Sequence, residues 1–393
     1  MNDWRPQTWA VRAQAEETTH HEHSVPMFLT SSFVFEDSEE MRAAFAGEID
    51  RNIYGRFTNP NVEELSEKIR RLEGAEAGHS MATGMAAVFA TFGALLSSGD
   101  HILACRSLFG STHTILTKIL PRFGITHTYV DTGDPDSWPG EIRENTKMIF
   151  VETPTNPAVD LVDLKWLGEL AGEKGVILVV DNCFATPILQ RPLEFGAHLS
   201  IHSATKYLDG QGRVMGGVVV GGKDLVKEIY DFARATGPSL SPFNAWVLSK
   251  SVETLEVRME KHSENALVAA QWLEGRPGVA SVRYPFLRSH PQYKIAKRQM
   301  SGGGGVLAFT VEGGLEQGKR FMDSVKLCSL TANLGDTRTI VSHPASTTHA
   351  KLTEEERQAV GITPGLIRIS VGLEDLRDVI ADVDQALKAS AAS

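Results

Sequence analysis

Two short apolar segments, each running directly into reactive polar residues, constrain the fold of this chain most strongly. Residues 176–180 end in Asp181 and Asn182, and residues 199–202 run into Ser203-Ala204-Thr205-Lys206-Tyr207. Both segments have the length and the apolar composition of buried strands. We therefore predict two strands that carry an acid, two hydroxyl groups and a lysine into one site.

These residue types match the chemistry of pyridoxal phosphate. The amine of Lys206 would bond to the cofactor, the carboxylate of Asp181 would keep the ring nitrogen protonated, and the hydroxyls of Ser203 and Thr205 would bind the phosphate. Lysine suits this role because burial can lower its pKa, whereas arginine cannot be deprotonated. Taken singly, such a lysine is usually a surface charge and such an aspartate a cap or turn former. In this order and spacing they predict a cofactor site.

Composition excludes several classes of function. The net charge of −10 argues against a nucleic-acid partner, because phosphate backbones need clustered Lys and Arg. No apolar run approaches the length of a membrane span, and the first residues lack a signal-peptide core. The 3 cysteines are scattered and the 13 histidines lack metal-ligand spacing, so we expect reduced thiols in a cytoplasmic protein without a metal site.

The first half of the chain predicts an α/β fold. A helix is expected over residues 62–72, where Leu65, Ile69 and Leu72 follow helical spacing and Gly74 ends it. Short apolar strands separated by helices then predict a mainly parallel sheet covered on both faces. The predicted strands are residues 101–105, 126–130, 148–151, 176–180, 199–201 and 217–220, with helices over 111–123 and 164–173.

The chain divides into three predicted parts. Residues 1–60 read as an irregular arm, residues 61–255 as a large cofactor-binding domain, and residues 256–393 as a smaller α+β domain. A long helical region, 242–275, bridges the domains. The smaller domain has predicted strands at 279–284, 306–311 and 367–371, a helix opening with the capping box of Thr353 and Glu356, and a last helix over 376–387.

A second phosphate-binding feature precedes these strands. Ala82-Thr83-Gly84-Met85-Ala86 lies where an apolar helix begins, so its backbone N–H groups and the positive end of the helix dipole suit a phosphate. A glycine needed only for close packing is the alternative interpretation. The spacing is not that of a dinucleotide-binding turn.

Several separated segments together resemble the Cys/Met-metabolism family of pyridoxal-phosphate enzymes, the cystathionine γ-synthase-like group of fold type I. The resemblance covers essentially the whole chain and implies an α/β fold with a mainly parallel sheet of seven-stranded type in the large domain. The segments are Asn52-Ile53-Tyr54-Gly55-Arg56, Thr83-Gly84-Met85, Glu152-Thr153-Pro154-Thr155-Asn156-Pro157, Asp181-Asn182, His202-Ser203-Ala204-Thr205-Lys206-Tyr207, His343-Pro344-Ala345-Ser346 and Ile367-Arg368-Ile369-Ser370.

The resemblance implies roles for further residues. The backbone amides of Gly84 and Met85 would bind the phosphate, and Asn156 and Arg368 would hold the substrate carboxylate. Tyr54 and Arg56 would complete the phosphate site of a neighbouring subunit. The resemblance therefore implies a homodimer as the active unit, and family members are commonly homotetramers.

Within the family, three phrases resemble the O-succinylhomoserine sulfhydrylase subgroup. They are Ser107-Leu108-Phe109-Gly110-Ser111-Thr112, Asp209-Gly210-Gln211-Gly212-Arg213 and Ser241-Pro242-Phe243-Asn244-Ala245-Trp246. Phe109 stands where many members carry a tyrosine that stacks on the cofactor, so stacking is kept without a phenol. Arg338 stands where cystathionine-handling relatives carry a glutamate, which favours a small nucleophile such as sulfide over cysteine.

The resemblance implies a γ-replacement with O-succinylhomoserine and sulfide as small-molecule substrates. Cystathionine γ-synthase and O-acetylhomoserine sulfhydrylase activities stay open as alternatives, and a methionine or cystathionine γ-lyase is a further one. A protein that binds the cofactor without turnover is the alternative from another functional class; the set of Lys206, Asp181, Asn156 and Arg368 speaks against it.

Overall fold

A computed structural model describes residues 4–350, 353–358 and 360–391. Its larger sheet has seven strands, four of whose neighbouring pairs are parallel. The strand of this sheet that comes last in the sequence, β7, runs antiparallel to both of its neighbours. In spatial order the strands are β1 (Ala77–Met81), β7 (Gly217–Gly221), β6 (Leu199–Ser203), β5 (Ile177–Asp181), β4 (Thr146–Glu152), β2 (His101–Cys105) and β3 (Thr126–Val130). The predicted mainly parallel sheet is confirmed.

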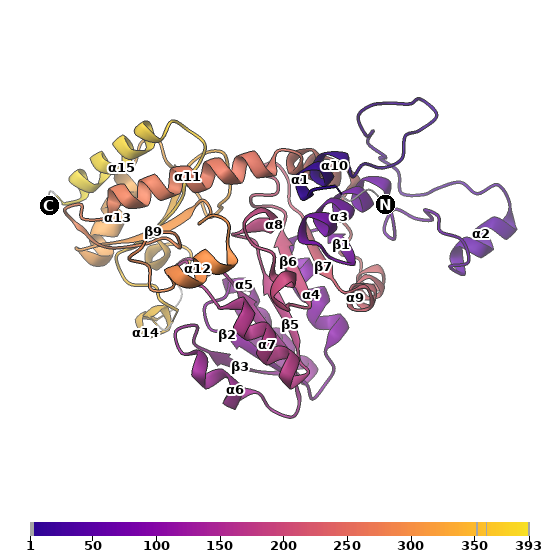
Figure 1. Cartoon of the computed structure of the whole chain (residues 1–393), viewed down its shortest axis with the longest axis horizontal. Coiled ribbons are helices and arrows are strands. Elements are labelled where there is room, and N and C mark those ends of the chain that lie inside the picture. The colour runs from indigo at the N-terminus through magenta and orange to yellow at the C-terminus, as the bar shows by residue number, and fades with distance from the viewer. Residues whose placement is uncertain (1–3, 351–352, 359, 392–393) are drawn as a thin grey trace.

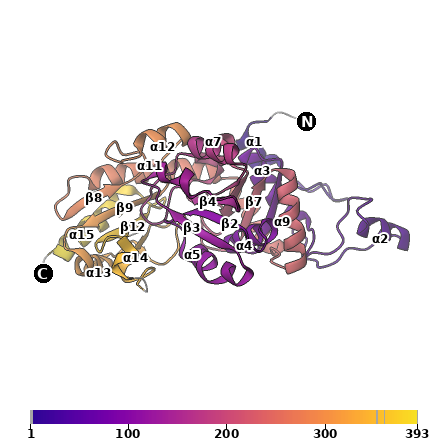
Figure 2. The same ribbon diagram turned by 90° about the horizontal axis from the view of Figure 1, so that it is seen from below.

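Helices cover both faces of this sheet, which explains why its most buried strands are strongly apolar. Every residue of β2 and β7 is buried. Figure 2 shows α3 and α7 on one side of the strands and α4 on the other. The helices of this part include α3 (Pro60–Glu73), α4 (Gly84–Leu95), α6 (Trp138–Glu141), α7 (Leu164–Lys174), α8 (Thr186–Leu189), α9 (Lys223–Thr236), η3 (Pro135–Ser137) and η4 (Pro192–Phe195).

A second, five-stranded sheet is built from the C-terminal part of the chain, as expected for an α+β unit. Its strands in spatial order are β10 (Ser329–Leu330), β11 (Ile340–Ser342), β12 (Leu366–Ser370), β9 (Val306–Val311) and β8 (Val279–Arg283). Figure 1 shows α11, α13 and α15 gathered around it. Its helices are α11 (Leu255–Leu273), α12 (Tyr293–Gln299), α13 (Gly314–Ser324), α14 (Glu354–Gln358), α15 (Leu376–Ala391) and η5 (Pro344–Ser346). The domain boundary after residue 255 stays a prediction.

Two predicted helix boundaries, the end of α3 and the start of α14, are confirmed. Gly74 ends α3 in the left-handed conformation, with φ of 70°. The capping box before α14 is formed: the hydroxyl of Thr353 accepts the N–H of Glu356 at 3.2 Å, and the carboxylate of Glu356 accepts the N–H of Thr353 at 2.8 Å.

Two predicted helices are divided in the structure. The region 242–275 forms α10 (Pro242–Val252) and α11, separated by Glu253 and Thr254. The stretch 111–123 passes through α5 (Gly110–Thr114), the π-helix η1 (Ile115–Ile119) and the 3₁₀-helix η2 (Leu120–Phe123). Pro121 explains the second case, because proline has no N–H to continue an α-helix.

The prediction of an irregular arm is wrong in part. The arm contains α1 (Pro6–Arg12) and α2 (Ser38–Phe45), and Oδ1 of Asp37 caps α2 by accepting two N–H groups at 2.9 and 2.8 Å. Figures 1 and 2 both show α2 standing away from the body of the molecule, at the end opposite α15. Residues 1–3 and 392–393, at the ends of the predicted parts, lie outside the described residues. No helix of the described chain is both long and apolar enough to cross a membrane.

Candidate active site

The two strands of the opening prediction lie side by side and bring Asp181 and Lys206 to one edge of the sheet. Strands β5 and β6 are parallel neighbours, Asp181 is the last residue of β5, and Lys206 follows β6 in a tight turn. Burial lowers the pKa of Lys206 and raises the pKa of Asp181. The charge of Asp181 opposes the shift of Lys206, and the charge of Lys206 opposes the shift of Asp181. The site therefore places a buried amine near a buried carboxylate of opposite charge.

The N-terminus of α4 meets the end of β6 so closely that only glycine fits at the contact. A Cβ atom at Gly84 would lie 2.7 Å from Cβ and 2.9 Å from Cα of Ser203. Thr83 is the N-cap of α4, so the N–H groups of Gly84 and Met85 belong to the first turn and have no carbonyl partner within the helix. Ser203 lies at this contact, so the first N–H groups of α4 and the Ser203 hydroxyl form a cradle that suits a phosphate. The hydroxyl of Thr205 accepts the N–H of Gly216 at 3.2 Å, and its predicted role in binding the phosphate stays a prediction.

Arg368 and Asn156 are brought together from different sheets. Arg368 lies in the middle of β12 with 4% of its surface exposed, and one of its terminal nitrogens donates to Oδ1 of Asn156 at 2.8 Å. The other donates to the carbonyl oxygen of Asn333 at 2.9 Å, and Nε has no hydrogen-bond partner among the described residues. Burial lowers the pKa of Arg368 to about 10, so it stays charged at neutral pH. A buried guanidinium with a spare donor suits a carboxylate.

Phe109 lies directly before α5, in the segment that follows β2. Its side chain is 44% exposed, so the ring has a face on which a planar group can stack. Its backbone is held in place, because the N–H of Phe109 donates to Oε2 of Glu152 at 2.9 Å.

Two residues of the site were missed by the sequence analysis, which assigned no role to Glu152 or Asn333. Glu152 ends β4, is 5% exposed and pairs in register with Asp181 on β5. Burial and the charge of Asp181 raise the pKa of Glu152 well above its usual range. Its signal was an acid directly after an apolar strand, the same signal that identified Asp181. Asn333 accepts a hydrogen bond from Nζ of Lys206 at 2.6 Å, and no sequence pattern pointed to that contact.

The recorded contacts of Tyr54 and Arg56 are not with the residues above. The guanidinium of Arg56 lies 4.8 Å from the centre of the Phe57 ring and donates to the carbonyl of Arg234 on α9. Tyr54 is 41% exposed on the arm. Their predicted role in a neighbouring subunit stays a prediction.

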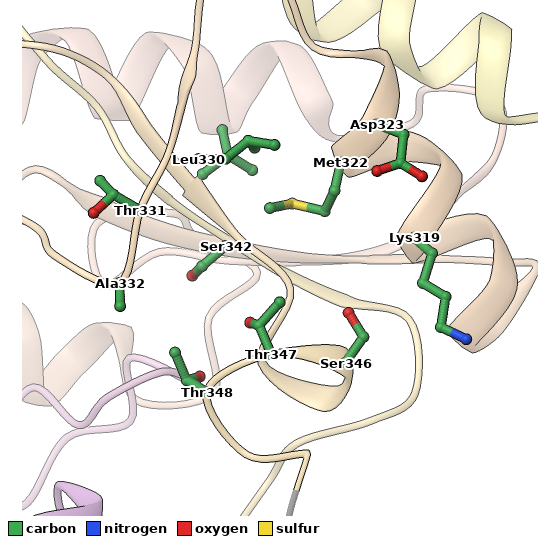
Figure 3. A pocket seen from close by; sticks show the side chains of 11 residues that line it. Lys319, Met322, Asp323, Leu330, Thr331, Ala332, Ser342, Ser346, Thr347 and Thr348 are labelled. Atoms are coloured by element: carbon green, nitrogen blue, oxygen red, sulfur yellow. The ribbon is translucent and has the colours of Figure 1, made fainter.

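A hollow of about 550 Å³ opens on the C-terminal sheet beside this site. Figure 3 shows Met322 and Leu330 on one side of it and the hydroxyl-bearing Ser346 and Thr347 on the other. Its wall reaches Ala332, next to Asn333, but none of the residues predicted to bind cofactor or substrate lines it.

The family model for Cys/Met metabolism PLP-dependent enzymes matches residues 7–388 of this chain. The chain belongs to that family. It is 50% identical over 382 residues to an O-succinylhomoserine sulfhydrylase from Pseudomonas aeruginosa, covering 97% of this chain and 95% of the relative. It is 44% identical over 383 residues to an L-methionine gamma-lyase from Porphyromonas gingivalis, covering 97% and 96%.

A solved structure of the same fold confirms the fold class. The crystal structure of metY from Campylobacter jejuni subsp. jejuni superposes with a TM-score of 0.94 at 34% identity, covering 98% of this chain and 100% of that one. That structure carries N'-pyridoxyl-lysine-5'-monophosphate. The cofactor of this PLP-dependent family member is pyridoxal phosphate. The glycine-only contact at Gly84 and the buried pair of Asp181 and Lys206 fit that group.

Proposed function

We propose that this enzyme converts O-succinyl-L-homoserine and sulfide to L-homocysteine and succinate, a γ-replacement in methionine biosynthesis. The observation that carries the choice of nucleophile lies in the loop that contacts Lys206. There Arg338 donates from two nitrogens to the two carboxylate oxygens of Asp336, each at 2.8 Å. The carboxylate in this loop is therefore already paired, and the loop offers no free anion for the ammonium group of cysteine. Sulfide needs no such partner.

Lys206 is proposed to be the acid and base of the reaction. Pyridoxal phosphate supplies a protonated ring that stabilises negative charge beside the substrate's α-carbon. Lys206, with its pKa lowered by burial, takes the proton from the α-carbon. Loss of a second proton, from the β-carbon, allows succinate to leave the γ-carbon with the electrons of its C–O bond. Sulfide then adds at the γ-carbon, and protons return to the α- and β-carbons.

The other site residues are proposed to hold and orient. Arg368 and Asn156 bind the α-carboxylate, and the unpaired Nε of Arg368 supplies a further donor. Asp181 holds a proton on the ring nitrogen. Phe109 stacks on the ring and, lacking a phenol, takes no part in proton transfer.

The N-terminal arm is proposed to bind a second copy of the chain. It projects from the body and carries large apolar side chains that are exposed in the single chain. These include Leu29 at 66%, Val34 at 85% and Phe45 at 53% exposure. A homodimer would bury them and would bring Tyr54 and Arg56 to the phosphate site of the neighbouring subunit, and two such dimers would form a homotetramer.

A methionine γ-lyase is the second candidate, because the chain is 44% identical to such an enzyme. Activity with O-acetylhomoserine, or as a cystathionine γ-synthase, is a narrower variant of the main proposal. The purified holoenzyme should be assayed for homocysteine with sulfide and either O-succinyl- or O-acetyl-L-homoserine, and for 2-oxobutyrate with L-methionine alone. We expect the highest kcat/KM with the succinyl ester. Preference for the acetyl ester would correct the acyl group, and efficient release of 2-oxobutyrate from methionine would contradict the proposal.

A further inference from the structure

The buried carboxylate of Glu152 connects two walls of the site that belong to different segments. Its Oε2 accepts the N–H of Phe109 and its Oε1 accepts the N–H of Asn156, both at 2.9 Å. Phe109 follows β2 and Asn156 follows β4, and these strands are neighbours in the sheet. The Glu152 side chain therefore holds the backbone of Phe109, whose ring is proposed to stack on the cofactor. It also holds the backbone of Asn156, whose side-chain amide is proposed to bind the substrate carboxylate.

These contacts continue as an unbroken hydrogen-bonded series to the proposed catalytic lysine. Oδ1 of Asn156 accepts from Arg368 at 2.8 Å, and Arg368 donates to the carbonyl oxygen of Asn333 at 2.9 Å. Oδ1 of Asn333 in turn accepts from Nζ of Lys206 at 2.6 Å. The series joins the large sheet to the small one through the site. Glu152 lies at the end of the series that belongs to the buried strand β4 of the large sheet.

We propose that Glu152 is a positioning residue, which sets the ring of Phe109 and the amide of Asn156 relative to each other through their backbone N–H groups. A carboxylate can accept both N–H groups at once, one on each oxygen. A glutamine can accept only one, because its NH₂ group would face the other N–H. Glu152 lies in register beside Asp181, and the two N–H groups that its oxygens accept offset the cost of burying a second acid there.

A purely structural role is the competing explanation, and the chain offers a matched control for it. Asp382 on α15 is 6% exposed and its two oxygens accept the N–H groups of Lys326, Leu327 and Cys328 at 2.8 to 2.9 Å. It therefore clamps backbone N–H groups in the same way as Glu152, in a part of the C-terminal unit that holds none of the proposed site residues. Asp382→Asn and Glu152→Gln make the same chemical change.

The test compares the two variants as holoenzymes by titration with L-norleucine, followed by the change in cofactor absorbance, and by visible circular dichroism of the bound cofactor. For Glu152→Gln we expect the dissociation constant of norleucine to rise about tenfold or more and the circular dichroism band to change. For Asp382→Asn we expect a lower melting temperature with both readouts unchanged. Glu152→Gln behaving like Asp382→Asn would overturn the proposal.

Two features keep this test decisive. If Glu152→Gln does not fold, Glu152→Asp keeps the charge on a side chain one methylene shorter, which cannot reach both N–H groups, and the same readouts apply. The inference rests on the proposed roles of Phe109 and Asn156. Norleucine has no leaving group, so failure of the proposed reaction would appear in the product assay and failure of this inference in the titration.

Discussion

Nζ of Lys206 lies 2.6 Å from Oδ1 of Asn333, and this contact joins the two sheets of the molecule. Lys206 follows β6 of the seven-stranded sheet, whereas Asn333 lies between β10 and β11 of the five-stranded sheet. The carbonyl of the same asparagine accepts a hydrogen bond from Arg368. The amine proposed to act on the substrate and the guanidinium proposed to bind its carboxylate are therefore held by one residue.

Replacing Lys206 tests whether the amine itself is required. We expect Lys206→Ala to lower kcat by at least about a hundredfold while cofactor stays bound weakly and without a covalent bond. Lys206→Arg should be equally inactive, because a guanidinium cannot give up its proton at neutral pH. Turnover with O-succinyl-L-homoserine and dialysis of the bound cofactor measure the two effects. An unchanged rate in either variant would contradict the role.

Replacing Gly84 tests the phosphate cradle. In Gly84→Ala the new methyl group would meet the backbone of Ser203, so the start of α4 must shift. Overpacking of this kind costs about 1–3 kcal/mol, so we expect cofactor to bind roughly tenfold to a hundredfold more weakly when apoenzyme is titrated with it. Gly172→Ala on α7, where a Cβ meets nothing within 4 Å, is the control and should leave cofactor binding unchanged. Equal cofactor affinity in the two variants would argue against phosphate at α4.

Complementation tests whether Arg56 acts in a neighbouring subunit. We expect Arg56→Ala and Lys206→Ala each to be nearly inactive alone. In a co-expressed random mixture, half of the dimers are mixed and each mixed dimer has one site with both native residues, so about a quarter of wild-type activity should return. If Arg56 served the site of its own chain, no site would be complete and no activity would return.

The pH dependence of stability should reveal the clamp of Asp382. Burial raises the pKa of this carboxyl, but the N–H groups of Cys328, Lys326 and Leu327 outweigh it and the net pKa is lowered. A lowered pKa stabilises the folded state above the unfolded value, near pH 4, and that stability is lost as the pH falls through the folded value. Thermal unfolding should therefore show Asp382→Asn less stable than wild type at pH 7, with the difference shrinking below about pH 4. A difference independent of pH would contradict this.

The central strands of the large sheet could be predicted because burial on both faces requires a continuous apolar run in the sequence. Residues 101–105, for example, match the fully buried β2 residue for residue. β1 was missed because Ala77-Gly78-His79-Ser80-Met81 has no such run, and its pairing with β7 depends on distant residues. β10 and β11, of 2 and 3 residues, are too short to carry a pattern.

Some residues of the candidate site could likewise be predicted from the sequence, and others could not. Asp181 and Lys206 could be predicted because each follows an apolar strand, and the two strands are neighbours along the chain. The contacts of Glu152 with the N–H groups of Phe109 and Asn156 could not be predicted from the sequence. They depend on β2 and β4 lying side by side, although β3 comes between these strands in the sequence. Asn333 could not either, since its partner Lys206 is 127 residues away in the chain.

Competition between sulfide and cysteine shows directly which nucleophile attacks the substrate. Purified holoenzyme is mixed with O-succinyl-L-homoserine and equimolar sulfide and L-cysteine, and the products are identified by mass. Because Arg338 occupies the carboxylate of Asp336, we predict that homocysteine predominates. A predominance of cystathionine would contradict the account and would mean that the ammonium group of cysteine finds a partner elsewhere in the site.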